Sequence, residues 1–469
     1  MGGFINRPIQ PLQQSKVDQA LVKMIATDFQ PFTIVEDRGF RAYTAALDPS
    51  YVLPSRGTIS KRMLPNLFEK SHTSQNLAQE LSRVAKEWGI QDKIAACVTD
   101  NASNIVKAVN DILKWNHVRC FAHLLNLTVR SSVHQTEIQA LILKVKSIAE
   151  YVRRSTVASA KLREMQLQMG QVQLRMKQDV ATRWNSTYFM MQRAIEIKEP
   201  LVSTMALLNP LLPALTPEEW DITKEVCDIL KPFEEVTVEM SSERFVTGSK
   251  AILMARGLQR IVAHRQRNPS THEPVKGMVN FLAADLEKRF GQIERVRVLA
   301  EATLLDPRFK KHAFVIERNA EETVSRVVGA ATHAATPTLP STEEEEEEEG
   351  GTTVNPPSEP VPQFWADFEE RVTTLRPGVQ NPSTGAMLEI KGFLAEPLIP
   401  RKADPLEWWR VRALVYQNIC TVMKTRLCIV ATSVPSERVF SKTGQIITDR
   451  RNRLSPSKVR ELVFLNANL

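Results

Sequence analysis

The sequence has few of the features that mark secreted, membrane or disulfide-stabilised proteins. No apolar run reaches 18 residues, and the most apolar stretch, 201–215, is interrupted by Pro210 and Pro213, so no membrane partner is expected. No pattern typical of a signal peptide opens the sequence. The five cysteines are scattered and odd in number: Cys97, Cys120, Cys227, Cys420 and Cys428. They indicate no disulfide framework and favour a reducing compartment.

The charge is strongly uneven along the 469 residues. The net charge is +8, although residues 343–349 are seven consecutive glutamates; without those seven charges the remainder would carry 8 + 7 = +15. A basic balance of this size favours a polyanionic partner such as nucleic acid. The glutamate run lies among Pro, Thr and Ser in 336–362, which predicts a solvated acidic linker rather than a packed domain.

The stretch 94–127 carries the first candidate site. Residues 94–98 form a short apolar run of the length expected for a buried strand, and Asp100 follows it just before a helical pattern. A carboxylate at this point is well placed for metal binding or acid–base chemistry. The alternative is a helix cap formed by Asp100 or Asn101.

Two further pairs of residues suggest binding chemistry. Cys120 and His123 have a zinc-like spacing but make only half a site, so the alternative is a buried thiol and a hydrogen-bonded imidazole, and no structural zinc is expected. No Cys-x2-Cys or His-x3–5-His pair occurs before residue 70. Arg183 and Trp184 could hold a phosphate and stack on an unpaired base; the alternative is a core Trp beside an exposed Arg.

Several motifs together resemble the hAT superfamily of transposases, and most of all the zinc finger BED domain-containing proteins. They are VTDNASN at 98–104, CFAH at 120–123, DVATRWNST at 179–187, and the block 404–469, which contains PLEWW and SERVFS. The resemblance implies an α/β, α-rich fold: a truncated RNase H-like core interrupted by a large all-α insertion, with the hAT C-terminal dimerisation region. No BED finger is expected in this chain.

The resemblance also implies a division of the chain into successive parts. These are a disordered N-terminus (1–14), a helical DNA-binding-like segment (15–70), the first part of the core (71–190), the helical insertion (191–335), the acidic linker (336–362), the end of the insertion (363–403) and the dimerisation region that completes the core (404–469).

Within this plan the resemblance assigns roles to individual residues. Asp100 and Glu437 correspond to the second and third carboxylates of a DDE site, and Cys120 and His123 lie beside it. Trp184 with Arg183 would contact DNA, as would Arg56 and Lys61. Dimerisation is assigned to Trp408, Trp409, Val439, Phe440, Leu462 and Val463. From the pattern alone, the helical face with Leu462 and Val463 fits either core or interface.

The first carboxylate of such a triad has no counterpart. Lys70 runs directly into Ser71, where the family has a long further stretch, and this shortening has two alternative origins, a real deletion or an exon left out of the gene model. Between Ser71 and Asp100 the acidic residues are Glu80, Glu87 and Asp92. The first two belong to an amphipathic helix and the third to a turn. Two remaining carboxylates would bind Mg²⁺ weakly.

The sequence therefore predicts a nuclear, transposase-derived protein that binds DNA with weak sequence specificity, dimerises through its C-terminal region, regulates transcription and needs no cofactor. The alternative is a residual DDE transposase or nuclease that depends on Mg²⁺ and takes a carboxylate from a partner subunit. Both the DNA partner and the nuclear location rest on the resemblance.

Overall fold

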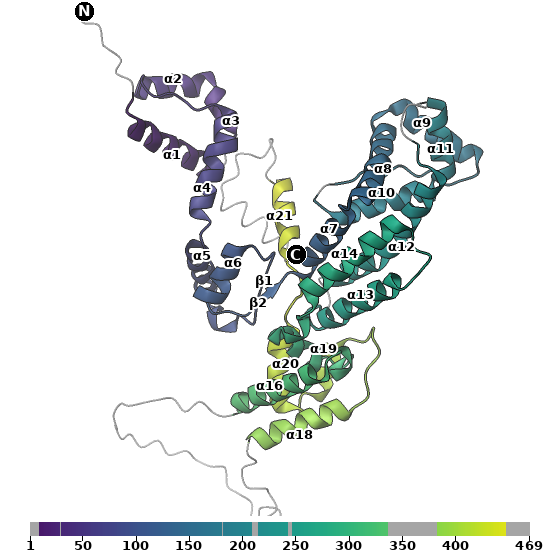
Figure 1. Ribbon diagram of the computed structural model, residues 1–469. Coiled ribbons are helices and arrows are strands. Elements are labelled where there is room, and N and C mark those ends of the chain that lie inside the picture. The colour runs from purple at the N-terminus through teal and green to yellow at the C-terminus, as the bar shows by residue number, and fades with distance from the viewer. Residues whose placement is uncertain are drawn as a thin grey trace, which may run out of the picture.

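The structure is a computed structural model that describes residues 9–28, 30–180, 182–208, 214–242, 246–335 and 382–446. It is mostly helical, which confirms the α-rich expectation. Figure 1 shows the central helices α7 to α14 running side by side, with α16, α18, α19 and α20 grouped below them. Among the helices so described, none combines the length and apolarity needed to cross a bilayer.

The N-terminal helices form a small body with a core of their own. They are α1 (Pro11–Thr27), α2 (Arg38–Leu47), α3 (Arg56–Thr58) and α4 (Leu64–Ser71), with single turns at Phe32–Glu36 and Ile59–Met63. Leu21, Ile25, Val35 and Ile59 are buried together. Helix α1 begins at Pro11, where proline fits the first helical turn, so the expectation of disorder up to residue 14 was wrong for 11–14. Residues 1–8 lie outside the described part.

Two parallel strands follow this body. Helix α5 (Ser74–Glu87) leads through Gln91–Lys93 to β1 (Cys97–Thr99), and α6 (Ser103–Lys107) with the turn Ala108–Ile112 leads to β2 (His117–Arg119). Cys97 pairs with His117 and Thr99 with Arg119. Strand β1 starts at Cys97, later than the apolar run 94–98 that was expected to form it. The first backbone hydrogen bond between the two strands runs from the Cys97 N–H to the carbonyl of Asn116. The Ala95 carbonyl instead accepts from the side chain of Asn116.

The central helices bury the largest apolar cluster. They are α7 (Phe121–Val133), α8 (Thr136–Arg154), α9 (Thr156–Gln168), α10 (Trp184–Glu196), α11 (Lys198–Leu208), α12 (Pro217–Met240), α13 (Ala251–Gln266), α14 (Glu273–Phe290) and α15 (Arg297–Leu305). Short turns at Gly248–Lys250 and Ile293–Arg295 join them. The expected boundary at 190/191 falls inside α10, whose Met190 and Met191 are both fully buried in this cluster, so one core crosses that point.

A second cluster is built from the last helices. These are α16 (Glu317–Ala335), α18 (Pro382–Ala395), α19 (Pro405–Arg412), α20 (Gln417–Leu427) and α21 (Val434–Ile446), with a turn at Lys310–Ala313. All but α21 contribute to an aromatic-rich core with Phe393, Trp408, Trp409 and Tyr416. The acidic linker 336–362, the neighbouring 363–381 and the end of the chain, 447–469, lie outside the described residues.

Lys310 joins these last elements through its side chain. It is 2% exposed, has a positive φ of 49° and donates from Nζ to the carbonyls of Phe393 and Glu396 at the end of α18. A lysine that satisfies otherwise unpaired carbonyls at a helix C-terminus stabilises that end. Burial lowers the pKa of Lys310, and the carboxylate of Glu396 opposes this effect.

Candidate functional site

Three distant parts of the chain meet at the N-terminal end of α7. The Cys120 N–H donates to the Thr99 carbonyl (2.7 Å), and the Phe121 N–H donates to the Ala431 carbonyl (2.9 Å). The Ser433 N–H donates to the Cys120 sulfur (3.3 Å). Asp100 follows Thr99 directly, and Glu437 lies one helical turn beyond Ser433. The segments that carry the two carboxylates are therefore anchored at the same helix end, which we call the α7 hub.

The DVATRWNST motif at 179–187 contacts the same helix. The backbone N–H of Trp184 donates to Oδ1 of Asn126 at 3.2 Å. Asn126 lies six residues beyond Cys120, which corresponds to roughly 9 Å along a helix axis. Four motifs that are separated by up to about three hundred residues in sequence are thus held on the first two turns of α7.

Asp100 is held in a tight turn rather than at a helix cap. Its Oδ1 accepts the N–H of Ala102 (3.2 Å), the pattern of an Asx turn, and α6 begins only after Ala102. Asn101 has a φ of 76°, a conformation that asparagine adopts more readily than most residues. Asn104 donates to the carbonyl of His72 (2.9 Å), so the VTDNASN motif is joined to the segment just before α5. Asp100 itself is exposed.

Glu437 is exposed near the start of α21. Its Oε1 accepts the hydroxyl of Ser433 at 3.1 Å. Two hard cations need several oxygen ligands arranged around both ions. Here each carboxylate has one oxygen in a local hydrogen bond, and Asp179, the acidic residue of the motif that docks on α7, is bonded to Lys146, Ser186 and Thr187. The residues present therefore do not fit a two-magnesium site.

The other acidic residues of the region face elsewhere. Glu80 and Glu87 pair with Arg83 on the exposed side of α5, at 2.6 and 2.8 Å. Asp92 is exposed in the turn before β1. Over the described part of the chain, no three His, Cys, Asp or Glu side chains are grouped as ligands for one ion.

Cys120 and the neighbouring histidines have structural surroundings. The Cys120 thiol is 1% exposed and accepts the Ser433 amide, whereas His123 is half-buried on α7. The imidazole of His117 shares a 2.8 Å hydrogen bond with the hydroxyl of Thr99 across the two strands. Burial, and then the charge of Arg119, lowers the pKa of His117. This imidazole is therefore neutral at neutral pH and helps to fix the strand end that precedes Asp100.

Trp184 belongs to the core, contrary to the expected role as a base-stacking residue. It is 3% exposed and packs in the central cluster, with its ring centroid 6.2 Å from that of Tyr188. A base could reach this ring only if the cluster opened. Arg183 is exposed at the N-cap of α10 and remains a candidate for phosphate contact. The motif thus fits the alternative of a core tryptophan next to an exposed arginine.

Asp179 is the first residue of the DVATRWNST motif at 179–187, and its side chain has a structural role. Its carboxylate accepts from Lys146 (3.0 Å), Ser186 (3.1 Å) and Thr187 (2.7 Å), and so closes the loop onto the first turn of α10. Burial alone would raise the pKa of Asp179, but the hydrogen bonds from Thr187, Lys146 and Ser186 outweigh it and lower the pKa below its ordinary value.

Arg56 and Lys61 are both exposed in the N-terminal body. Arg56 opens α3, which Ser55 caps by accepting the N–H of Thr58 at 3.1 Å, and Lys61 lies in the following turn. Buried Ile59 between them anchors this turn in the N-terminal core. The placement leaves both cations available to a partner.

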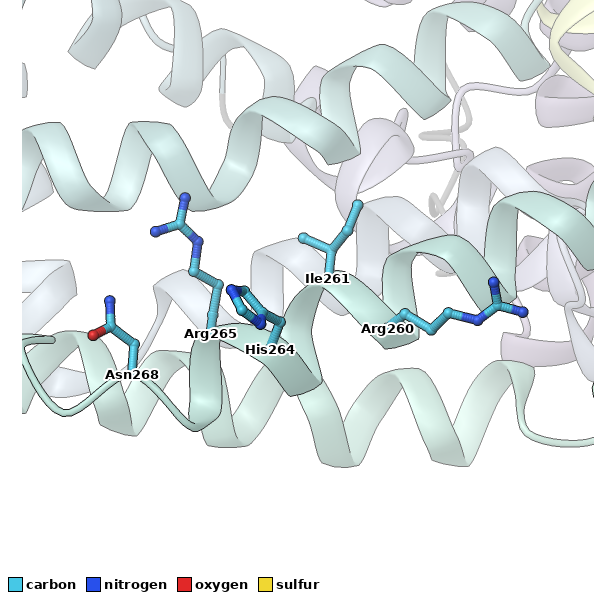
Figure 2. A pocket seen from close by; sticks show the side chains of 5 residues that line it. All are labelled: Arg260, Ile261, His264, Arg265 and Asn268. Atoms are coloured by element: carbon cyan, nitrogen blue, oxygen red, sulfur yellow. The ribbon is translucent and has the colours of Figure 1, made fainter.

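A basic groove on α13 was not anticipated from the sequence. It is lined by Arg260, Ile261, His264, Arg265 and Asn268. Figure 2 shows these side chains along one length of the helix, with His264 between the two arginines. Neither Arg260 nor Arg265 takes part in an ion pair among the described residues. By contrast, Arg256 one turn earlier pairs with the buried Glu294 at 2.8 Å. The repeated spacing of four residues was visible in the sequence, but the pairing of Arg256 was not.

Two of the residues assigned to dimerisation are core residues instead. Trp409 is 1% exposed and donates from Nε1 to the carbonyl of Leu305 (2.9 Å), and Trp408 is 9% exposed. Both pack on Phe393, so the expectation that they form an interface was wrong. On α21, Val439 is half-buried and Phe440 is 73% exposed. Leu462 and Val463 lie outside the described residues.

Comparison with known proteins agrees with the motifs. Residues 118–229 match the ZBED1 RNase-like helical domain, and residues 389–469 match the hAT family C-terminal dimerisation region. The first match runs from β2 into α12, and the second begins in α18.

Three relatives agree with these family matches. The chain is 24% identical, over 97% of its length, to zinc finger BED domain-containing protein 4 of Homo sapiens, of which it covers 43%. It is 26% identical, over 84% of its length, to the putative AC transposase of Zea mays, covering 51% of it. It is 22% identical, over 96% of its length, to zinc finger BED domain-containing protein RICESLEEPER 3 of Oryza sativa subsp. japonica, covering 69% of it. The chain thus spans about half the length of the human and maize relatives.

Proposed function

We propose that this chain, which is similar to hAT-family transposases and zinc finger BED domain-containing proteins, binds DNA through phosphate contacts, self-associates through its C-terminal region and does not catalyse strand transfer. Its fold would be a truncated RNase H-like core with a helical insertion. The proposed location is the nucleus and the proposed role is transcription regulation, which imaging of the tagged chain and a reporter assay would test.

The observation that carries DNA binding is the basic groove on α13. Arg260 and Arg265 both line this groove, and His264 lies between them along the helix. Guanidinium groups without a carboxylate partner are available to phosphate oxygens, for which their planar donors are suited. Arg183 and the N-terminal Arg56 and Lys61 would add contacts from other elements. Since these are contacts to phosphate rather than to base edges, sequence preference should be weak.

The absence of strand transfer is proposed from the acidic residues that are present. Asp100 and Glu437 are the carboxylates of the segments anchored at the N-terminal end of α7, and the acidic residues between Ser71 and Asp100 pair with Arg83 or face solvent. The alignment with the human relative runs over 531 residues although this chain has 469. That relative therefore contains internal residues without a counterpart here.

Salt-dependent DNA binding tests the proposal. The logarithm of the association constant should fall linearly with the logarithm of salt concentration, with a slope of about −0.9 for each phosphate contacted. Replacing both groove arginines (Arg260→Gln and Arg265→Gln) should make the slope shallower by about 2. Arg318→Gln is the matched control, because this arginine is 85% exposed but pairs with Glu322 on α16. Binding that is independent of salt, or a control that changes the slope equally, would contradict the proposed contact.

One observation favours the second candidate, a residual nuclease. The α7 hub anchors the segments of Asp100 and Glu437 at one helix end, as a catalytic site would require. A partner subunit could then supply a third carboxylate. Incubation of supercoiled and linear DNA with the chain and Mg²⁺ or Mn²⁺ distinguishes the two candidates. Cleavage that disappears in both Asp100→Ala and Glu437→Ala would favour the nuclease and overturn the proposed lack of chemistry.

A further inference from the structure

A group of large apolar side chains is exposed along α19 and the turn that follows it. Leu414 is 85% exposed, Val411 and Val415 are each 64% exposed, and Leu406 is 49% exposed. We call these four residues the α19 patch. Leu406 and Val411 lie on the exposed side of α19 with Glu407 and Arg410 between them, and Leu414 and Val415 follow in the turn after the helix.

The opposite side of the same helix explains why the patch faces outward. Pro405, Trp408, Trp409 and, after the turn, Tyr416 are buried in the C-terminal core. The Trp409 indole bonds to the Leu305 carbonyl, which fixes the rotation of α19 about its axis. With this face committed to the core, Leu406, Val411 and Leu414 cannot turn inward. The exposed side of the helix therefore combines the apolar Leu406 and Val411 with the charged Glu407 and Arg410.

We infer that the α19 patch is the contact surface between two copies of this chain. The inference rests on the proposed self-association and names the face that would carry it. All four residues lie within 389–469, the part of the chain that matches the hAT family C-terminal dimerisation region. The tryptophans of that region are buried within one chain, so they are not available to a second copy, whereas the patch is.

The size of the patch fits the centre of such an interface. Four side chains exposed to this degree present on the order of 400 Å² of apolar surface, a size at which a contiguous patch usually marks an interaction site. A stable interface takes about 800 Å² from each partner. The patch would therefore form the apolar centre, and the surrounding polar residues of α19 would form the rim.

The charges that lie between Leu406 and Val411 are self-complementary. Glu407 and Arg410 pair with each other at 2.6 Å and remain 56% and 72% exposed at their side chains. In a two-fold interface each residue meets the same surface of the other copy, so Arg410 of one copy can face Glu407 of the other. Arg412 is already committed, since it pairs with Glu396 and lies over the Trp408 ring at 4.5 Å. A neutral apolar surface with one paired rim does not suit DNA, which requires unpaired cations.

The test compares the mass of the full chain in solution with that of single variants, by analytical ultracentrifugation over a range of concentrations. Leu414→Glu places a carboxylate at the centre of the patch, twice in a symmetric dimer, and should weaken association by about 100-fold or more. Val411→Glu should act in the same way. Leu167→Glu is the matched control: Leu167 is 61% exposed on α9, outside 389–469. Because all three positions are exposed, each variant should unfold at the temperature of the wild type.

The outcomes separate the inference from the proposal beneath it. A wild-type dimer that becomes monomeric in both patch variants and stays dimeric in the control supports the α19 patch. A dimer that survives both patch variants overturns this surface and leaves self-association intact. A wild-type chain that stays monomeric at all concentrations overturns the proposed self-association itself. A control that dissociates as strongly as the patch variants would also overturn the assignment to α19.

Discussion

Replacing Trp409 by alanine should loosen the C-terminal core of each chain rather than separate two chains. The side chain is 1% exposed, donates an indole hydrogen bond of 2.9 Å to the Leu305 carbonyl and lies 5.1 Å from the Phe393 ring centroid. Truncating a buried tryptophan to alanine destabilises a core by about 3–5 kcal/mol, which combines lost burial with the cavity left behind. Trp409→Phe keeps most of the packing and loses the hydrogen bond, so its effect should be about 1–3 kcal/mol.

Hydrogen exchange followed by mass spectrometry measures this change locally, which is preferable in a chain with several cores. Amides of α18 and α20 should exchange about a hundred-fold or more faster in Trp409→Ala, while those of α1 should be unchanged. Leu414→Ala provides the contrast, because an exposed side chain contributes within about 0.5 kcal/mol to folding. Unchanged protection of α18 and α20, together with loss of the dimer, would refute the assignment of Trp409 to the core.

Four more substitutions test other parts of the structure. The lowered pKa of Asp179 means that its hydrogen bonds stabilise the fold above the ordinary aspartate range and cease to do so as the pH falls through the folded pKa; Asp179→Asn should therefore melt earlier at pH 7 and show a weaker dependence of melting temperature on acidification. Glu301 is fully buried among three arginines, so Glu301→Gln should lower the free energy of unfolding by about 3–5 kcal/mol in thermal melts, and wild-type stability would contradict the ion cluster. Asp100→Ala and Glu437→Ala should leave DNA affinity in a filter-binding assay unchanged within twofold, because neither carboxylate attracts phosphate.

The motifs predicted the similarity to hAT-type proteins and the helix-rich fold because they consist of residues with local roles. Asp100 and Asn101 form a turn with their own neighbours, and the helical periods report the buried faces directly. The outcome differed where burial depended on distant residues. Trp184 and Trp409 look alike in the sequence as candidates for an interface or a ligand, and only the arrangement of the helices makes both of them core residues. The same limit concealed the α13 groove, since nothing near Arg256 indicates its pairing with Glu294.

Two distant segments of the chain also meet through contacts that no local pattern could reveal. Ser433 and Cys120 are 313 residues apart in sequence and are joined by one amide–sulfur hydrogen bond. The spacing of Cys120 and His123 resembles half of a zinc site, because cysteine and histidine are common metal ligands. The Cys120 sulfur instead receives the segment that leads into α21. A spacing motif reports which chemistry a side chain can perform, whereas the partner that occupies it is fixed by the topology of the chain.

The hub itself bears on how such a fold could persist without catalysis. Its defining contacts are made by the backbone of Thr99, Phe121 and Ala431, the Cys120 sulfur and the Asn126 amide. Neither Asp100 nor Glu437 takes part in them, and each of the two makes only a local hydrogen bond at an exposed position. Exposed groups of this kind contribute little to folding. If the chain lacks strand transfer, as proposed, the loss of that chemistry would cost little stability, and the same scaffold would still present the groove of α13 and the α19 patch, two surfaces that require a stable fold but no metal.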